Sequence, residues 1–401
     1  MAGAKSYEIA KREVVDAFER VKAKGGGAGA DGVTLVDFEK DLRGNLYRIW
    51  NRLSSGSYFP PPVKRVEVQE EGGKIRPLGI PTVGDRIAQM VVKQRLEPEL
   101  EPLFDENSYG YRPGRSAHDA LKVARRLCWK HDWVLDLDIK GFFDNLDWSL
   151  LMKAVRKHAK EAWVTLYIQR WLGADVILPD GTVQKRDRGT PQGGVISPLL
   201  ANLYMNRFLK HWRTTGRGEA FRAAIVNYAD DFVILSRGRA AEALAWTRDV
   251  MTRLGLSINE AKTSVRDAQQ ERFDFLGYTF GPHIWRKNGR RYLGASPSRK
   301  SVQRLKDKIG GVLVPGNVAP WPEVRDQLNS MLRGWSQYFS YGTRMSAYKT
   351  IDHHVHGQVS RFLVRRHKVA GRGTRTFPVG MIRGKLGVLA LRPLLVTRRG
   401  P

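Results

Sequence analysis

Cysteine and long hydrophobic runs are both scarce in this 401-residue sequence. The single cysteine, Cys128, excludes a disulfide within the chain and a cysteine-rich zinc site, and its place in an apparent helix predicts a small core residue. No stretch approaches the roughly 18 consecutive apolar residues of a membrane-spanning helix. The N-terminal residues lack the apolar core of a signal peptide. We therefore expect a cytoplasmic protein with no membrane partner.

Acidic residues are also few. The sequence contains 40 Asp and Glu against 68 Lys and Arg, so its net charge is +28, and no acidic residue follows Asp352. Such an excess disfavours a compact chain by itself and is typical of proteins that bind polyanions. An anionic membrane surface would balance the charge equally well, but the absence of a spanning run favours nucleic acid.

Apolar residues are plentiful, and their spacing predicts the fold class. A hydrophobic content of 42% with 11 Trp indicates a folded chain, whose length allows two to three domains. Strand and helix patterns interleave up to about residue 297 and helices follow, which favours an α+β fold with an antiparallel sheet. Asp85, Ser116 and Ser197 are the predicted N-caps. The predicted helices cover 6–24, 35–53, 85–96, 116–130, 149–171, 240–254 and 321–339, and the predicted strands cover 63–68, 74–80, 133–143, 225–235 and a segment interrupted at Gly277.

The segment Ile225–Leu235 reads IVNYADDFVIL and sets two adjacent acids, Asp230 and Asp231, between two apolar runs. The β-branched and aromatic residues on both sides predict a hairpin whose turn carries the acids. Neighbouring carboxylates repel one another, so the pair is costly unless cations lie opposite, and divalent metal ions are the simplest candidates. The alternative is a surface turn, because Asp is common in turns.

A second acidic strand and two basic segments are candidate partners. WVLDLDIKGFF, residues 133–143, places Asp136 and Asp138 on one face, and the two aromatics that follow favour a pocket. Loop 107–121 mixes tyrosines with Arg112 and Arg115, which suits base stacking and phosphate contacts, although a tyrosine-rich loop packed on its own domain would look the same. The basic hairpin over 63–80 carries Lys64, Arg65, Lys74 and Arg76.

These groups suit phosphoryl transfer. That chemistry needs carboxylates for two metal ions about 4 Å apart, cations for the phosphates and an apolar shelf for the nucleotide. Asp138 and Asp230 supply the carboxylates if their strands are neighbours, and Lys74 and Arg76 supply cations.

Ordered motifs extend over residues 30–370 and resemble the reverse transcriptase of bacterial group II introns. LRGWSQYFSYG (332–342) is similar to the family's thumb or maturase motif. The other motifs are KIRPLGIP (74–81), NSYGYRPGRSAHDAL (107–121), LDIKGFFD (137–144), TPQGGVISPLLANLYMN (190–206), YADD (228–231), LSINEAKT (256–263) and FLGYTF (275–280).

The resemblance implies a right hand with fingers, an antiparallel-sheet palm that carries the YADD hairpin, and an α-helical thumb. Its divisions would be an N-terminal extension and start of the fingers (1–60), fingers (61–130), palm (131–290, with a fingers-associated segment near 180–200), helical thumb or maturase region (297–370) and a basic C-terminal tail (371–401).

The resemblance also implies roles for single residues. Metal ions would be held by Asp138, Asp230, Asp231 and the backbone of Ile139, and the three aspartates would be catalytic, with Asp231 in a supporting role. The residues implied to contact the dNTP are Lys74, Arg76, Phe143, Gln192, Ala229 and Lys262. Among these, Phe143 would exclude a 2′-hydroxyl, and Lys262 would protonate the departing pyrophosphate. The residues implied to contact nucleic acid are Arg65, Tyr111, Arg112, Arg115, Gly277 in the primer grip, Arg333, Arg365 and Arg366.

The implied activity is RNA-directed DNA polymerisation with two Mg²⁺ ions, for which Mn²⁺ could substitute. The implied partners are an RNA template, a DNA or RNA primer, dNTPs and group II intron RNA, in a cytoplasmic prokaryotic ribonucleoprotein of open oligomeric state. With one cysteine, the chain lacks the cysteine-containing nuclease domain of many relatives, so we expect no second-strand cleavage. Two alternatives stay open: a non-catalytic RNA-binding splicing cofactor, and a host-adopted reverse transcriptase acting in DNA repair or defence. The paired acids favour a working polymerase.

Overall fold

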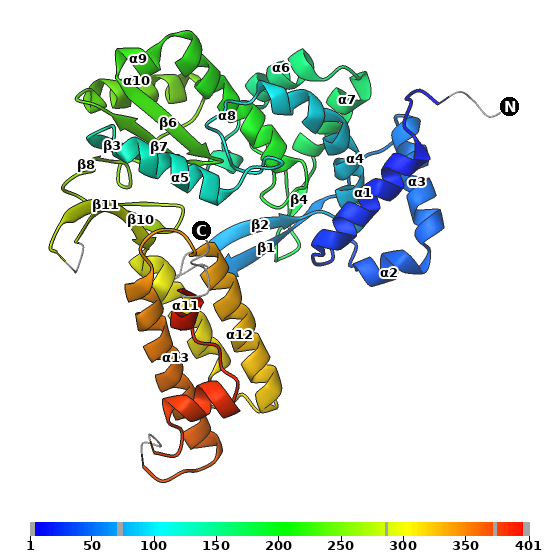
Figure 1. The fold of residues 1–401 in the computed structure, drawn as a ribbon. Coiled ribbons are helices and arrows are strands. Elements are labelled where there is room, and N and C mark those ends of the chain that lie inside the picture. Colours follow the sequence, from blue (N-terminus) through cyan, green and yellow to red (C-terminus); the bar gives the residue numbers. More distant parts are fainter. Residues whose placement is uncertain (1–4, 70–74, 285–287, 372–374, 396–401) are drawn as a thin grey trace. The chain divides into compact units, whose positions relative to one another are not determined.

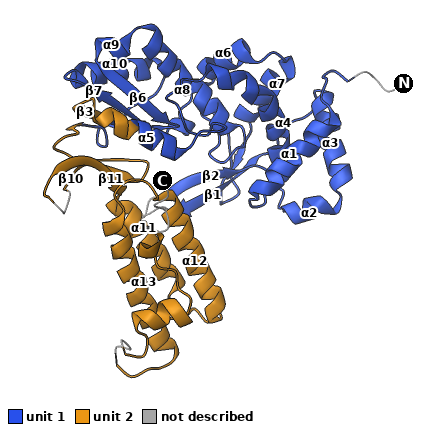
Figure 2. Cartoon of the chain, viewed as in Figure 1, with its two compact units in different colours: residues 1–123, 135–265 blue, residues 124–134, 266–401 orange. Residues whose placement is uncertain are grey.

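The structure is a computed structural model that describes residues 5–69, 75–284, 288–371 and 375–395 (Figure 1). The chain divides into two compact units (Figure 2). Unit 1 comprises residues 1–123 and 135–265, and unit 2 comprises 124–134 and 266–401. The division falls within α5 (Ala117–Cys128), β3 (Trp133–Asp138) and β8 (Ser264–Asp267). The architecture is α+β, as the periodicity predicts.

Unit 1 starts with short amphipathic helices that contribute to one hydrophobic core. α1 (Lys11–Lys24) begins at Lys11 rather than Ser6. The helix predicted over 35–53 is two helices, α2 (Leu35–Lys40) and α3 (Leu42–Ser54), because Asp41 leaves helical geometry and its carboxylate accepts from the Gly44 amide at the start of α3. The helix predicted over 149–171 is also two helices. The later helices of unit 1 are α6 (Trp148–His158), α7 (Ala162–Leu172), α8 (Ser197–Thr214), α9 (Arg217–Ala220) and α10 (Ala240–Arg253).

Two predicted N-caps are wrong. Thr82 caps α4 (Val83–Leu100), since its hydroxyl accepts from the amide of Asp85, and the Asp85 side chain is buried inside the first turn. α8 has Ile196 at the cap position, and the Ser197 hydroxyl instead shares a 2.8 Å hydrogen bond with the Thr190 hydroxyl. In both helices, polar groups that look like caps in the sequence serve buried tertiary contacts.

Two sheets of unit 1 position the candidate site. One has the order β2-β1-β4-β5, in which β1 pairs antiparallel with β2 and parallel with β4, a short departure from the all-antiparallel prediction. The other has the order β6-β7-β3-β8, so β3 is the neighbour of β7. The strands not yet bounded are β1 (Val63–Gln69), β2 (Ile75–Ile80), β4 (Val176–Ile177), β5 (Val183–Gln184), β6 (Ala223–Tyr228) and β7 (Asp231–Ser236).

Unit 2 joins a small antiparallel sheet to a group of helices. The strand predicted to break at Gly277 is two antiparallel strands, β9 (Phe273–Phe275) and β10 (Tyr278–Ile284), and β10 also pairs with β11 (Arg291–Pro297). Gly277 has a φ of 76°, which fits the turn between β9 and β10. The helices are α11 (Arg299–Val312), α12 (Trp321–Tyr338) and α13 (Met345–Arg366).

The C-terminal segment packs on these helices. The last acid of the sequence, Asp352, is buried on α13 and accepts from the amides of Leu391 and Arg392 at 2.8 and 3.2 Å. Arg383 lies 3.7 Å from the same carboxylate, so part of the basic excess after Asp352 is compensated. Ile382 is also buried in the core of this unit.

Across the part of the chain that the structure describes, no helix is long and apolar enough to span a membrane.

Candidate active site

The β6–β7 hairpin carries the acid pair on a tight turn. Tyr228 pairs with Asp231 in the register, which leaves Ala229 and Asp230 as the two turn residues. Ala229 has a φ of 59°, a strained value for a residue other than glycine. Asp230 is exposed at the tip, whereas Asp231 begins β7 and is half-buried. The two acids therefore differ in position and in access to solvent.

A buried polar contact fixes this turn. Asn227 is fully buried at the end of β6, and its side chain donates to the carbonyl of Ala229 at 2.8 Å and accepts from the Ser108 hydroxyl at 3.0 Å. The backbone of Asn227 also bonds to Asn107 and Tyr109 on both sides of Ser108. The 107–121 motif thus holds the strand that leads into the turn.

Asp138 ends β3 with two side-chain partners from the 256–263 motif. Its carboxylate accepts from Asn259 Nδ2 at 2.9 Å and lies 3.2 Å from Lys262 Nζ. The Asn259 amide also donates to the Asp138 carbonyl at 2.7 Å, and Ile139 forms an isolated bridge with Ile258. The Lys262 ammonium therefore lies beside a carboxylate of the candidate site, and its role as a general acid stays a prediction.

Asp138 and Asp230 interact electrostatically. Desolvation raises the pKa of the Asp230 carboxyl, the negative charge of Asp138 also raises it, and the positive charge of Arg76 opposes the rise. The pKa of Tyr111 is raised by desolvation and by Asp230. The carboxylates from β3 and from the hairpin are thus near enough to repel each other, and a cation relieves such repulsion.

This donor set fits a hard divalent metal ion. Carboxylate and backbone carbonyl oxygens are the ligands that Mg²⁺ prefers, and Asp138, Asp230 and the carbonyl of Ile139 are of that kind. Among the described residues, no three or more His, Cys, Asp or Glu side chains are gathered into a ready-made metal cluster. Asp231 accordingly is not part of a compact three-acid group in this structure.

A chain of polar contacts joins the β1–β2 hairpin to the PQG loop, residues 191–193. Arg76 Nε on β2 donates to Gln192 Oε1 at 3.0 Å, and Gln192 Nε2 donates to Asp144 Oδ2 at 3.1 Å. Burial raises the pKa of the Asp144 carboxyl, and the hydrogen bond from Gln192 lowers it. Two predicted dNTP contacts, Arg76 and Gln192, thus touch each other. Another predicted dNTP contact, Lys74, lies outside the described residues.

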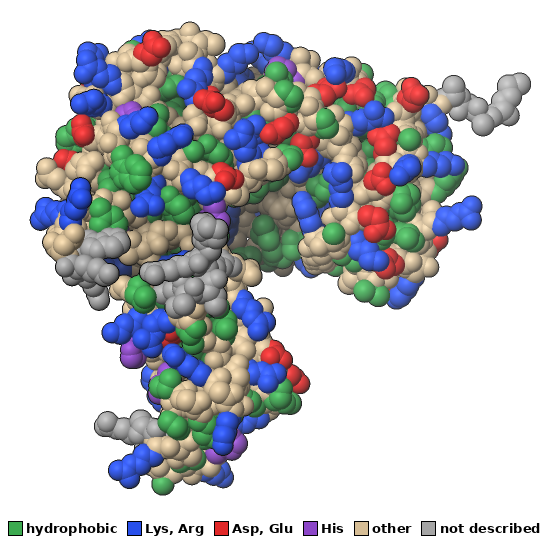
Figure 3. All heavy atoms as spheres, viewed as in Figure 1, with side chains coloured by type: hydrophobic (Ala, Val, Ile, Leu, Met, Phe, Trp, Pro, Cys, Tyr) green, Lys and Arg blue, Asp and Glu red, His purple; other side chains and the backbone are tan. Residues whose placement is uncertain are grey.

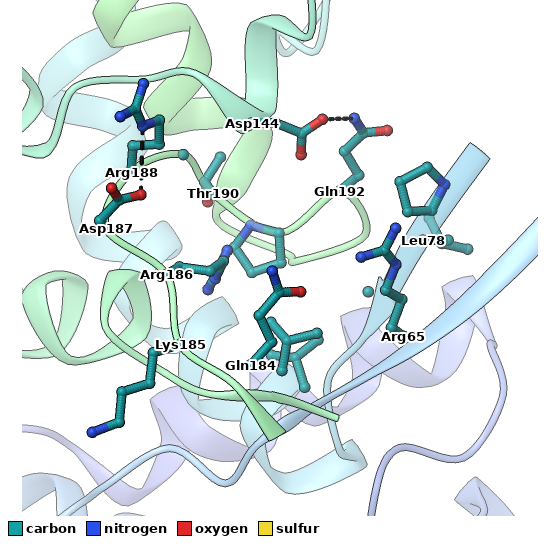
Figure 4. A pocket seen from close by; sticks show the side chains of 16 residues that line it. Arg65, Leu78, Asp144, Gln184, Lys185, Arg186, Asp187, Arg188, Thr190 and Gln192 are labelled. Carbon is teal, nitrogen blue, oxygen red and sulfur yellow. Dashed lines mark hydrogen bonds and ion pairs between the residues drawn. The ribbon is translucent and has the colours of Figure 1, made fainter. Parts of the chain in front are cut away.

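Gln192 and Asp144 also line a pocket of about 340 Å³ between the β1–β2 hairpin and residues 184–192 (Figure 4). Arg65 and Arg186 line the same pocket, and the Nε atom of each is buried without a hydrogen-bond partner among the described residues. Buried guanidinium groups with unused donors are suited to phosphate oxygens. The pocket accordingly presents two guanidinium groups to an anionic ligand.

Phe143 forms an aromatic wall beside these groups. It is 7% exposed, and its ring lies 5.7 Å from the ring of Phe142 and 6.5 Å from that of Tyr111, both edge-on. Its carbonyl accepts from the amide of Thr190, so the aromatic wall is fixed to the loop that carries Gln192. Tyr111 is 50% exposed, so about half of this residue remains accessible to solvent.

The remaining predicted nucleic-acid contacts differ in exposure. Arg112 is 8% exposed, pairs with Glu101 at 2.7 Å and donates to the carbonyls of Asp105 and Ser108, so its guanidinium is occupied by protein groups. Arg115 is exposed and donates to the Glu106 carbonyl.

The other four predicted contacts belong to unit 2. Gly277 lies in the turn between β9 and β10, where its carbonyl accepts from the Ser301 hydroxyl at 2.9 Å. Arg333, Arg365 and Arg366 are exposed on α12 and α13, and Arg366 donates to the carbonyl of Ala319.

Sequence reasoning missed a buried network behind the PQG loop. Asp85 accepts from Tyr58, Trp171 and Gln89 at 2.8, 2.6 and 2.9 Å, and the carbonyl oxygen of the Gln89 side chain accepts from the amide of Val195 at 2.8 Å. Asp144 was also missed, although it ends the LDIKGFFD motif. An acid and an amide one turn apart, just before the apolar run 90–92, were the available signal for Asp85 and Gln89.

Comparisons with known proteins identify the family of the chain. Residues 68–280 match the family described as reverse transcriptase (RNA-dependent DNA polymerase), and residues 302–377 match the group II intron, maturase-specific domain. Protein YkfC of Escherichia coli (strain K12) is 32% identical over 286 residues, which are 62% of this chain and 74% of YkfC.

Two further relatives are intron proteins by name. The group II intron-encoded protein LtrA of Lactococcus lactis subsp. cremoris is 40% identical over 166 residues, 41% of this chain and 28% of LtrA. The putative COX1/OXI3 intron 1 protein of Saccharomyces cerevisiae is 24% identical over 405 residues, 82% of this chain and 48% of that protein. The chain thus aligns with less than half the length of either.

The family match covers more than half of the chain, and the residues it spans include both candidate carboxylates, the PQG loop and Arg76. The chain therefore belongs to the reverse transcriptase family, the RNA-dependent DNA polymerases, and carries the maturase-specific domain of group II intron proteins.

Proposed function

We propose that the chain extends a DNA or RNA primer on an RNA template, by attack of the primer 3′-hydroxyl on the α-phosphate of a dNTP. The observation that carries this proposal is the electrostatic interaction between Asp230, on the β6–β7 turn, and Asp138, at the end of β3. Strand β3 is the neighbour of β7 in the sheet. A protein that only binds RNA has no need of two carboxylates held in mutual repulsion. The positive charge of Arg76 lowers the pKa of the Asp230 carboxyl, whereas the charge of Asp138 raises it.

Different residues would bind the metal ions and orient the triphosphate. Asp138 and Asp230, with the carbonyl of Ile139, would hold two Mg²⁺ ions, which when bound lower the pKa of the attacking hydroxyl and neutralise the leaving oxygens. Arg76 and Gln192 orient the triphosphate, and Asp144 keeps the Gln192 amide in place.

Two further residues would select the deoxynucleotide and protonate the departing pyrophosphate. Phe143 closes the side of the site that a 2′-hydroxyl would occupy, so deoxynucleotides are preferred. Lys262, whose Nζ lies 3.2 Å from Asp138 Oδ2, donates a proton to the departing pyrophosphate.

The sheets and helices can be assigned to the palm, fingers and thumb of the proposed right hand. The sheet of β6, β7, β3 and β8 would be the palm, with the hairpin of the YADD motif at its catalytic end. The β1–β2 hairpin and the helices packed beside it would be the fingers, and α11, α12 and α13 would be the thumb. The maturase-specific match over residues 302–377 covers most of α11 and all of α12 and α13.

A second role, binding and helping to splice a group II intron RNA, is supported by the maturase match and by charge. Exposed arginines on α12 and α13 include Arg333 and Arg365, and Lys and Arg side chains are spread over the face drawn in Figure 3. Such a surface binds phosphates without reading sequence. We propose a cytoplasmic ribonucleoprotein as the working form.

Asp230→Asn tests the proposal. Primer extension on an RNA template with Mg²⁺ should fall by roughly 100-fold or more, because the variant removes a charge that acts at the reacting phosphate. Binding of the primer–template should stay within about 2-fold of wild type. Asp249→Asn, which changes an exposed acid on α10, is the matched control and should extend normally. Near-normal extension by Asp230→Asn would overturn the assignment.

The same variant separates the two roles. A splicing assay on a group II intron RNA should show unchanged activity in Asp230→Asn if RNA binding and polymerisation use different groups. If the wild-type protein supported splicing but did not extend a primer, the polymerase proposal would be overturned and a role as a splicing cofactor alone would remain.

A further inference from the structure

A hollow in unit 2 combines an exposed aromatic ring with arginines and lies apart from every residue used above. Its volume is about 630 Å³, and among the described residues it is lined by Arg125, Trp129, Asn288, Arg290, Arg291, Tyr292 and Leu293. Figure 2 shows the end of α5 and the β10–β11 strands within this unit. We call it the Trp129 hollow. None of these lining residues is an acid.

The Trp129 ring is presented for stacking. It is 62% exposed just after α5, an unusual state for a side chain with so much apolar area. The guanidinium of Arg125 lies 5.4 Å from the Trp129 ring and 5.6 Å from that of Tyr341, within cation–π range of both. The contacts hold the indole against α5, so its orientation is set before any ligand arrives.

The surrounding charge is unbalanced. Arg290 and Arg291 are exposed at the start of β11, and Arg125 Nε is buried with no hydrogen-bond partner among the described residues. Three guanidinium groups without a carboxylate between them attract an anion, and an aromatic face attracts a flat ring. A polynucleotide offers both an anion and a flat ring, because each of its nucleotides carries one phosphate and one base.

We propose that the Trp129 hollow binds a single-stranded segment of nucleic acid, with one base stacked on Trp129 and the flanking phosphates on Arg125, Arg290 and Arg291. A duplex would use the arginines alone, because its bases are already stacked on each other. An acidic peptide would satisfy the charges but would leave the indole face without a planar partner. The proposal does not depend on the polymerase reaction.

The test uses the full chain and a labelled strand of about 10 nucleotides, as RNA and as DNA of the same sequence. Unlabelled blunt primer–template duplex is present in excess, so that the labelled strand reports binding outside the polymerase site, and fluorescence anisotropy gives the affinity. Trp129→Ala should weaken binding by about 10-fold, and Trp129→Phe should restore most of it, because a smaller ring still stacks. The strand type that shows this loss is the one that the hollow binds.

Phe59→Ala is the matched control. Phe59 is 68% exposed and lies 3.9 Å from the guanidinium of Arg170, so it also presents an aromatic ring on an arginine, but in unit 1. Its removal should leave strand binding unchanged, and the Trp129 and Phe59 variants should bind duplex and unfold thermally like wild type. Arg290→Gln should lower the salt slope of strand binding by about 0.7. Unchanged affinity of Trp129→Ala for both strands, or an equal loss in Phe59→Ala, would overturn the proposal.

Discussion

At the scale of single residues, Phe143 is the position that should set sugar selectivity. Phe143→Ala opens the wall between Phe142 and Tyr111, so a 2′-hydroxyl is no longer excluded. The preference for dNTP over rNTP, measured as a ratio of kcat/KM values, should fall by about 10- to 100-fold. Phe142→Ala removes the neighbouring buried ring and should lower stability without changing the ratio. An unchanged ratio in Phe143→Ala would exclude the steric role.

Asp85 should give the protein an unusual dependence of stability on pH. Burial raises its pKa to about 6, despite hydrogen bonds from Trp171, Tyr58 and Gln89. An acid whose pKa is higher in the folded than in the unfolded chain binds more protons when folded, so its contribution is complete below pH ~4 and is lost as pH rises towards 6. The loss amounts to about 3 kcal/mol at most.

Asp85→Asn isolates that contribution, because other acids titrate identically in both proteins. The difference in unfolding free energy, wild type minus variant, should decrease between pH ~4 and ~6 and stay constant above that range. Denaturant unfolding at several pH values measures it. A constant difference across the range would show that Asp85 keeps an ordinary pKa.

At the scale of elements, the 107–121 motif should act by supporting the turn of the β6–β7 hairpin. A Cβ added at Gly110 would lie 2.5 Å from the Ala229 amide nitrogen and 3.0 Å from the Ala229 Cβ, so Gly110→Ala must displace the turn that carries Asp230. A shift of about 1 Å costs on the order of 100-fold in rate. Primer extension should fall accordingly while duplex binding persists.

Gly114→Ala is the control for the Gly110 prediction. Gly114 belongs to the same motif, has a φ of +68° and has no atom within 4 Å of an added Cβ. Alanine there strains the backbone by about 1 kcal/mol but touches nothing. Extension by Gly114→Ala should be near normal, and equal losses in both variants would mean that general loosening of the motif is responsible.

Elements with strong local signals were predictable from the sequence, and contacts between distant segments were not. The hairpin segment and α12 follow from apolar periodicity, because local burial decides them. Arg76 and Gln192 are 116 residues apart, and no local pattern reveals their hydrogen bond. Arg112 shows the same limit, since a cation among tyrosines suggested nucleic acid, and nothing in the sequence indicated that Glu101, 11 residues earlier, pairs with its guanidinium.

At the scale of the whole molecule, the net charge of +28 should make nucleic-acid binding depend steeply on salt. Each phosphate neutralised releases condensed counterions, so about six to ten contacts would reduce affinity by roughly 10³- to 10⁵-fold between 50 and 200 mM salt. Two exposed arginines distinguish a direct phosphate contact from the general effect of net charge. Arg365 on α13 is a proposed contact, whereas Arg248 on α10 forms a two-point pair with Glu260 at 2.9 and 2.6 Å.

Arg365→Gln should therefore reduce the slope of log affinity against log salt by about one, and Arg248→Gln should not change it, although both lower the net charge equally. Anisotropy titrations of one primer–template at several salt concentrations give both slopes. Equal slopes for the two variants would mean that the total charge, rather than arginines at defined positions, holds the duplex.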